Sequence, residues 1–504
     1  MAPINEDQHR QLDDGMEKRV VRKIDRFVIP ILFVTYMFNF MDRTILSSAS
    51  VFGLREDNAS NLMGQQYSWV SSMFYFGFFA WSYPTSILIA RLPVAKYLGV
   101  NGIFWGTVVA ATAACTSYGG LLAVRFLLGV AEATLTPAFM FLTSTWYTRD
   151  EIPVRTGIWF AGNSIGGLVA SLMAFGVGHI SPNNVVGPWR AMYMILGIGT
   201  FVWAFVIFAF LPDRISTARF LTEEERRYAA DRVVIAGTGS TEKTRWQLDQ
   251  VKECLIDPKT WLIFALEFAT QIPNGGTQNF ANLIIRSFGF TSLQSTLINI
   301  PYSLLAASVI AGTGWLAGRY RTMNCILIVC VVSPCIIGSA MIYRRDSISP
   351  DGVHLFAYFL LASGPGAMPL NLSLVQSNYR GVTKKMTVSA LVFFAYCAGN
   401  ISGPHFFRAS EAPTYNTAFR TIMVCYSLVV VFAMTLRVYL QWQNRKREQS
   451  EGLEGGPAPV TGDNLVTDKA SPRADPSMRE RDQLREENYY DITDWNTVGF
   501  RYRY

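Results

Sequence analysis

Residues 119–146 read GGLLAVRFLLGVAEATLTPAFMFLTSTW, an apolar run that carries one arginine, Arg125, and one glutamate, Glu132. A helix needs about 20 apolar residues to cross the hydrocarbon core of a bilayer, so this run is long enough to span a membrane. Seven residues separate the two charges, which on a helix is nearly two turns and almost the same face. An ionised side chain at the bilayer centre costs roughly 2.5–3.5 kcal/mol, so it is expected to pair with an opposite charge or to line a water-filled path.

The same pattern occurs at residues 27–49, FVIPILFVTYMFNFMDRTILSSA, where Asp42 and Arg43 are adjacent. A guanidinium offers a planar, bidentate match to a carboxylate, and a carboxylate side chain can carry a proton. The two runs together therefore predict an internal site that handles a charged solute and a proton. The alternative is that these charges form structural ion pairs that fix two helices.

Composition extends this interpretation to the whole chain. Only 16% of the 504 residues are charged and 50% are hydrophobic, whereas soluble proteins carry about 25% charged residues. We predict an all-α integral membrane protein with twelve transmembrane helices. The predicted spans lie near residues 27–50, 67–90, 99–117, 120–146, 156–180, 190–211, 260–284, 294–316, 322–343, 353–375, 386–407 and 418–440.

Loop charges and a repeat predict the topology. Lys and Arg gather in the loops on one side, which by the positive-inside rule predicts that both termini are cytosolic. The pentapeptides GNSIG in predicted span five and GNISG in span eleven fit two related six-helix bundles. The predicted segments are a cytosolic N-terminal tail (1–26), an N-terminal six-helix bundle (27–211), a cytosolic linker (212–259), a C-terminal six-helix bundle (260–442) and a disordered cytosolic C-terminal tail (443–504).

Several segments resemble a known family. They include MDRTILSSASVFGL (41–54), RFLLGVAEATLTPAFMFLTSTWY (125–147) and AGNISGPHFFRASEAPTY (398–415). In this order they resemble the major facilitator superfamily, and within it the anion:cation symporter family and the fungal allantoate permease group. The resemblance implies the major facilitator fold and proton-coupled uptake of organic anions such as allantoate, ureido acids, nicotinate or pantothenate.

The resemblance also implies residue roles. Arg43 and Arg125 would bind the substrate carboxylate, while Glu132 and Asp42 would carry the proton. Ser82 is a departure, because the chain reads WSYP where the allantoate permease group reads WEYP. An acid is therefore missing from a possible cavity position, which predicts altered coupling or substrate choice.

The second half supplies three more candidates. Glu267 is an acid within a predicted span, and it is a possible cavity residue together with Asn274. Asn400 is a candidate for binding the substrate through neutral hydrogen bonds. Packing between helices explains polar residues at such positions equally well.

Other classes of function find no support in the chain. The four histidines show no metal-ligand spacing, and no P-loop, nucleophile elbow or dinucleotide motif occurs. We therefore expect no metal, no cofactor, no enzymatic activity and no nucleic-acid binding. Asn58 begins a glycosylation sequon in a predicted outer loop.

The leading interpretation is a monomeric, multi-pass plasma-membrane transporter that symports a small organic anion with protons by alternating access. Its partners would be the anion, protons and the lipid bilayer. An alternative is an exporter of a fungal secondary metabolite, which the change at Ser82 keeps open. A more remote alternative is a transporter-like nutrient sensor that signals through its soluble segments.

Overall fold

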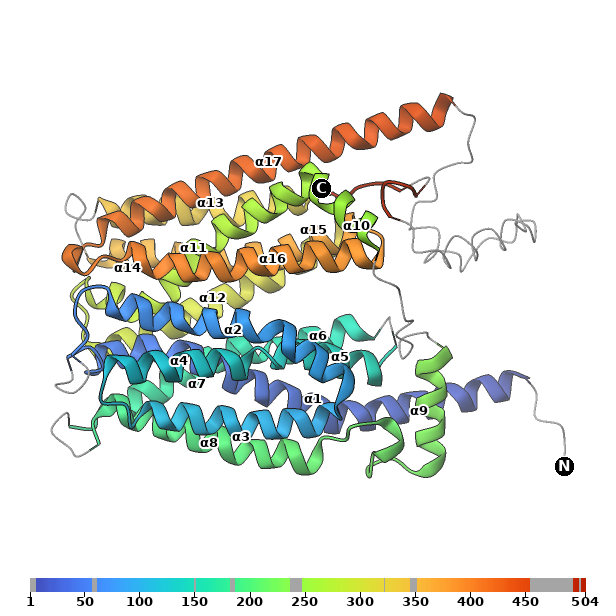
Figure 1. The fold of residues 1–504 in the computed structure, drawn as a ribbon, viewed down its shortest axis with the longest axis horizontal. Coiled ribbons are helices and arrows are strands. Elements are labelled where there is room, and N and C mark those ends of the chain that lie inside the picture. Colours follow the sequence, from blue (N-terminus) through green and yellow to red (C-terminus); the bar gives the residue numbers. More distant parts are fainter. Residues whose placement is uncertain are drawn as a thin grey trace. The chain divides into compact units, whose positions relative to one another are not determined.

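The computed structural model describes residues 6–56, 61–148, 151–181, 186–235, 247–320, 322–344, 351–453, 493–497 and 500–504. Every regular element within these ranges is a helix (Figure 1). Packing divides the chain into two compact units. Unit 1 comprises Met1–Glu242, Gly275–Ala307 and Pro404–Tyr415, and unit 2 comprises Lys243–Asn274, Ser308–Gly403 and Asn416–Tyr504. This grouping differs from the predicted bundle boundaries, because residues 275–307 and 404–415 pack with unit 1.

The helices that lie wholly or mostly in unit 1 are α1 (Glu6–Val51), α2 (Gln66–Arg91), α3 (Val94–Thr112), α4 (Tyr118–Glu132), α5 (Leu135–Trp146), α6 (Ile152–Phe160), α7 (Gly162–Val177), α8 (Pro188–Phe210), η1 (Ile215–Thr217), α9 (Glu223–Ile235), α12 (Ser292–Arg319), η4 (Gly403–Phe406) and η5 (Ala409–Glu411). Those that lie wholly or mostly in unit 2 are α10 (Leu248–Ile256), α11 (Pro258–Arg286), α13 (Asn324–Tyr343), α14 (Asp351–Leu360), η3 (Leu361–Gly366), α15 (Ala367–Asn378), α16 (Val382–Ser402) and α17 (Asn416–Leu453).

Eleven helical segments of the described chain are long and apolar enough to cross a membrane. They match the predicted spans except the one near 260–284. That stretch forms α11, which at 29 residues is also long enough to span but carries more polar side chains, among them Glu267 and Asn274. The predicted all-α membrane architecture is confirmed.

The predicted fourth span is not one continuous helix. It consists of α4 and α5, which are separated at Ala133 and Thr134. Pro137 has no N–H to offer the carbonyl four residues earlier, so the ladder weakens at this point. The amide of Asn101 on α3 donates to the carbonyl of Ala131 at 2.8 Å and satisfies part of the break. Glu132 is therefore the last residue of α4, next to a buried break in the helical hydrogen bonding.

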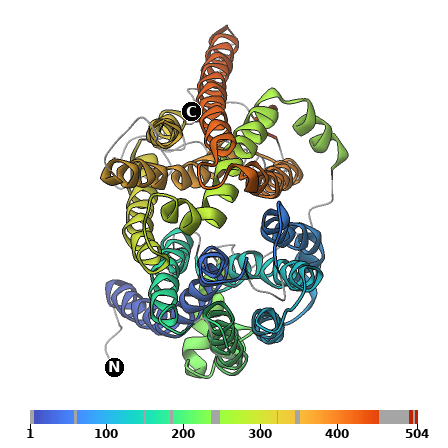
Figure 2. The same ribbon diagram turned by 90° about the vertical axis from the view of Figure 1, so that its left-hand side faces the viewer.

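Small residues set the distances between neighbouring helices of unit 1. Helices α3 and α8 lie side by side (Figure 1, Figure 2) because Gly106 leaves room for the backbone of Phe201. Helices α2 and α4 also approach closely: a Cβ at Gly129 would lie 2.0 Å from the carbonyl oxygen of Phe74. Close backbone approach through small residues is the usual way that membrane helices pack.

This packing predicts the effect of enlarging Gly129. Gly129→Val should push α4 away from α2 and destabilise unit 1 by about 1–3 kcal/mol, the usual cost of overpacking. Thermal unfolding of the purified protein in detergent measures the change. Gly119→Val is the matched control on the same helix, because a Cβ at Gly119 meets no atom within 4 Å. Equal melting temperatures for the two variants would contradict the role of Gly129.

The C-terminal tail differs from the expectation of disorder over residues 443–504. Helix α17 continues to Leu453, and residues 493–497 and 500–504 pack against unit 2. Buried charges at the ends of α11 and α16 supply the reason, since they pair with Asp494. A composition rich in charge, Gly and Pro does not reveal such distant partners.

Candidate functional site

Helix α1 presents two polar side chains to the end of α4. Asn39 and Arg43 are four residues apart, so they share one face of the helix. The Arg43 guanidinium donates through Nε to Oε2 of Glu132 at 2.9 Å, and the amide of Asn39 donates to the same oxygen at 2.7 Å. The structure thus joins Arg43 and Glu132, which the sequence placed on separate spans.

This pair is unequally exposed. The side chain of Glu132 is fully buried, whereas 21% of the Arg43 side chain remains exposed. The rings of Phe74 and Phe78 on α2 lie 5.3 and 5.5 Å from the Arg43 guanidinium carbon, within cation–π range. Oε1 of Glu132 accepts no hydrogen bond from the described part of the chain. Arg43 is therefore the accessible member of the pair, and its guanidinium lies over two aromatic rings.

Asp42 points elsewhere. Its carboxylate is fully buried and accepts a 2.6 Å hydrogen bond from the indole Nε1 of Trp105 on α3. Its sequence neighbour Arg43 bonds Glu132 instead, because adjacent helical residues face different directions. Trp105 was not among the predicted site residues, since nothing in an apolar span distinguishes it from a packing residue.

Arg125 also has an unexpected neighbour. It is buried and donates to the phenolic oxygen of Tyr193 on α8, over whose ring it also lies. No ion pair joins it to Glu132 among the described side chains. The charges nevertheless act on one another: Glu132 repels Asp42, and Arg43 and Arg125 attract both acids. The four predicted residues, two acids and two bases, therefore form one electrostatic group in unit 1.

Ser82 forms its side-chain hydrogen bond within its own helix and not with these four residues. Its hydroxyl donates to the carbonyl of Phe78 on its own helix at 2.6 Å. Such a bond satisfies a serine within a membrane helix without any partner from another helix. Asn58, the candidate for glycosylation, lies outside the described residues.

Unit 2 contains a separate cluster of amides around one acid. Glu267 on α11 is buried and accepts hydrogen bonds from Gln271 at 2.9 Å and from Asn371 on α15 at 2.6 Å. The Asn274 amide donates to Oδ1 of Asn400 and to Oε1 of Gln271, each at 3.1 Å. The predicted residues Glu267, Asn274 and Asn400 thus meet in one network. Gln271 and Asn371 link it, and only their polarity within apolar runs could have indicated them.

The side chains of Asn400 and Asn274 differ in how accessible they are to a solute. Asn400 is buried and also donates to Gln271 at 3.1 Å and to the carbonyl of Tyr396 at 2.8 Å. Asn274 is half-buried. Asn400 therefore ties α16 to α11, whereas Asn274 has the more accessible side chain. In the part of the chain that is described, no group of three His, Cys, Asp or Glu side chains has the arrangement of a metal site.

Comparison with known proteins agrees with this architecture. The sequence profile of the Major Facilitator Superfamily matches residues 32–404. An uncharacterized transporter of Schizosaccharomyces pombe is 34% identical over 448 residues, covering 88% of this chain and 86% of that protein. The allantoate permease of Saccharomyces cerevisiae is 30% identical over 505 residues, covering 96% and 86%. A bacterial homologue of the human lysosomal transporter Spinster, solved in an inward-facing, unoccupied conformation, shares the fold with a TM-score of 0.62 at 15% identity, over 82% of this chain and 96% of that one.

Proposed function

Because the chain belongs to the Major Facilitator Superfamily and is a multi-pass membrane transporter, we propose that it symports a small organic anion with protons across the plasma membrane. A relative that is named as an allantoate permease supports a carboxylate as the solute class. The expected solutes are allantoate or another ureido acid, nicotinate, pantothenate or a similar carboxylate. The acidic and basic residues of unit 1 support proton coupling.

The contact between Arg43 and Glu132 is the observation that carries this proposal. A partly exposed guanidinium is held by a buried carboxylate at 2.9 Å. An incoming carboxylate can bind the guanidinium through both of its oxygens, whereas Glu132 binds it through Oε2. The solute can therefore take over the guanidinium only if the charge of Glu132 is compensated in another way.

Protonation supplies that compensation. A buried carboxylate without a cationic partner is strongly disfavoured, so Glu132 is expected to take up a proton when Arg43 turns to the solute. Release of solute and proton restores the Arg43–Glu132 pair. One exchange of partners thus links binding of an anion to binding of a proton.

Asp42 and Arg125 are proposed as supporting members. Asp42 is a second acid whose charge is opposed by Glu132, so the two carboxylates are expected to hold at least one proton between them when Arg43 is engaged. Arg125 balances this charge from α4, and its bond to Tyr193 limits its reach. We expect Arg43 to be the main anchor of the solute carboxylate.

The amide cluster of unit 2 is proposed to hydrogen-bond uncharged parts of the solute. Asn274→Ala should raise KM about fivefold, since one hydrogen bond is worth about 1 kcal/mol, and should leave the maximal accumulation ratio unchanged. Uptake kinetics at several solute concentrations measure both quantities. A fall in accumulation with unaltered KM would assign Asn274 to coupling instead. Asn400→Ala is expected to act mainly on stability, because its amide joins two helices.

Uptake of a labelled carboxylate panel tests the proposed function. The panel contains allantoate, ureidosuccinate, nicotinate, pantothenate and galactonate, and the host is yeast lacking its own permeases. The expected result is accumulation of one compound that a protonophore abolishes. Absence of uptake by protein shown to reach the plasma membrane would contradict import of these anions and favour metabolite export.

A further inference from the structure

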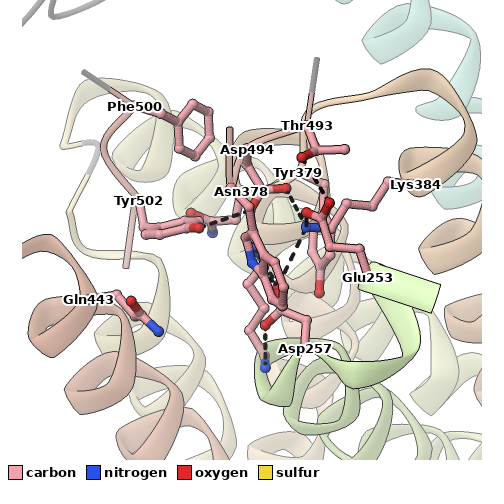
Figure 3. A network of polar contacts seen from close by, with 12 residues as sticks. Glu253, Asp257, Asn378, Tyr379, Lys384, Gln443, Thr493, Asp494, Phe500 and Tyr502 are labelled. Carbon is pink, nitrogen blue, oxygen red and sulfur yellow. Dashed lines mark hydrogen bonds and ion pairs between the residues drawn. The ribbon is translucent and has the colours of Figure 1, made fainter. Parts of the chain in front are cut away.

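Unit 2 holds the last residues of the chain against one end of its helices. Residues 493–497 and 500–504, here called the C-terminal segment, contact α10, the first turn of α11, the last residue of α15, the first turn of α16 and the end of α17 (Figure 3). By the charge distribution of the loops this end is predicted to be cytosolic. The contact is therefore the place where four predicted spans and the linker meet one peptide.

Asp494 pairs with two buried lysines, Lys259 and Lys384, and Figure 3 shows it beside Lys384. Its Oδ2 pairs with the Lys259 ammonium, and its Oδ1 lies 2.7 Å from the Lys384 ammonium. Lys259 is 1% exposed, and Lys384 and Asp494 are 0% exposed. Asp257 lies 3.0 Å from Lys259 and Glu253 lies 2.5 Å from Lys384, so two cations share three carboxylates.

The segment's neighbouring side chains bind the same helix ends. Thr493 donates to Oε2 of Glu253 at 2.9 Å, and the indole of Trp495 donates to Oδ2 of Asp257 at 3.0 Å. Asp494 is thus flanked by two residues that bind the carboxylates facing the lysines. The binding site on these helix ends is here called the socket. It presents lysines to Asp494 and carboxylates to Thr493 and Trp495.

The socket also binds the backbone of the segment. Asn378 at the end of α15 accepts from the N–H of Arg503 at 2.7 Å and donates to its carbonyl at 2.8 Å. Asn444 on α17 makes the same two bonds with Tyr502, each at 2.9 Å. Two amides that each pair with both backbone groups of one residue recognise an extended peptide, in the manner of peptide-binding domains.

Arg447 on α17 closes the arrangement. It donates to the backbone carbonyl of Asp494 at 2.8 Å and to the hydroxyl of Tyr502 at 3.0 Å, and that hydroxyl donates to Asp494 at 2.9 Å. Burial by itself would raise the pKa of Asp494, but the ammonium groups of Lys259 and Lys384 outweigh it and hold the pKa below its ordinary value of 3.8. Asp494 therefore stays ionised at any cytosolic pH.

We propose that the C-terminal segment is an intramolecular ligand that clamps the ends of α11, α15, α16 and α17, and that transport requires the clamp to be docked. Without the segment, two lysines would face only two carboxylates and both socket asparagines would lose their backbone partners. Buried charges and amides left in that state are costly, so the helix ends are expected to loosen. If these helices move together during the transport cycle, loosening of their ends is expected to slow transport.

The pH dependence follows from the depressed pKa of Asp494. A group of this kind stabilises the folded state above its ordinary pKa, and this contribution is lost as pH falls through the lower, folded value. The contribution of Asp494 to docking should therefore be constant above pH 3.8 and weaken below it. Asp494 thus does not act as a pH switch at cytosolic pH.

A cleavable full-length chain tests the proposal. A specific protease site is placed within residues 454–492, so that the protein folds intact and is cut only after purification. The expected result is that the cut fragment is lost on washing in salt, that the melting temperature falls, and that peptide DITDWNTVGFRYRY (491–504) restores it saturably. The D494N peptide should need at least a tenfold higher concentration. A melting temperature that is unchanged by cutting and washing, or restored equally by both peptides, would overturn the proposal.

A second comparison uses uncut full-length variants at equal surface abundance. Asp494→Asn should reduce transport several-fold and lower the melting temperature, whereas Asn496→Ala, an exposed residue of the same turn, should change neither. Unchanged transport by Asp494→Asn would overturn the functional part of the proposal. The melting measurements need no solute, so they succeed or fail independently of the proposed symport.

Discussion

Replacing Glu132 by glutamine is expected to abolish proton-driven accumulation of the solute while leaving exchange of solute across the membrane. Glutamine keeps the size of the side chain and can still accept from Asn39, but it carries no titratable proton. If one anion moves with two protons, a membrane potential of 100 mV contributes about 2.3 kcal/mol, or roughly 50-fold accumulation. The variant should approach a ratio of about 1, which counterflow and protonophore measurements on the same cells will show.

The matched control for this substitution is Glu223→Gln. Glu223 forms an exposed ion pair with Arg227 on α9, and 79% of its side chain is accessible. It tests whether loss of any acidic charge in unit 1 has the same effect. Accumulation that is unchanged in Glu132→Gln would remove this residue from the coupling mechanism and leave it as a structural partner of Arg43.

Replacing Arg43 by lysine should raise the apparent KM about tenfold, a loss of about 1.4 kcal/mol. Lysine retains the positive charge but loses the planar fork that matches a carboxylate and stacks on aromatic rings. In this protein the fork lies over Phe74 and Phe78 and bonds Glu132 through Nε. Initial rates of uptake over a wide range of solute concentration will separate KM from the maximal rate.

Arg227→Lys is the control for this experiment, because 78% of the Arg227 side chain is exposed on α9. It should leave both kinetic constants unaltered. A KM for Arg43→Lys equal to that of the wild type would mean that the guanidinium does not bind the solute. Arg125 would then become the leading anchor, despite its burial against Tyr193.

The local sequence was informative wherever a property belongs to a single segment. Apolar runs long enough to span the bilayer predicted the helical architecture, and charges inside those runs indicated candidate site residues, of which Arg43 and Glu132 are in contact. Breaks within spans were less predictable. The interruption after Glu132 depends on a proline and on Asn101 from another helix, so inspection of one run indicates only part of its cause.

The choice of partners belongs to the tertiary structure. Asp42 and Arg43 are neighbours in sequence, yet one bonds Trp105 and the other Glu132, because adjacent positions on a helix face different helices. Gln271 and Asn371 have no special spacing, and their role as partners of Glu267 arises only when α11 and α15 meet.

The sequence by itself determined that this is an all-α membrane transporter with charges at membrane depth, because hydrophobic length and the cost of burying charge are local properties. Only the tertiary structure decided that its last residues are ordered. Asp494 lies in a charged, polar tail, and it is held by Lys259, 235 residues earlier, and by Lys384. Such a contact depends on which distant residues the fold brings next to Asp494. The composition of the sequence around Asp494 does not indicate these partners.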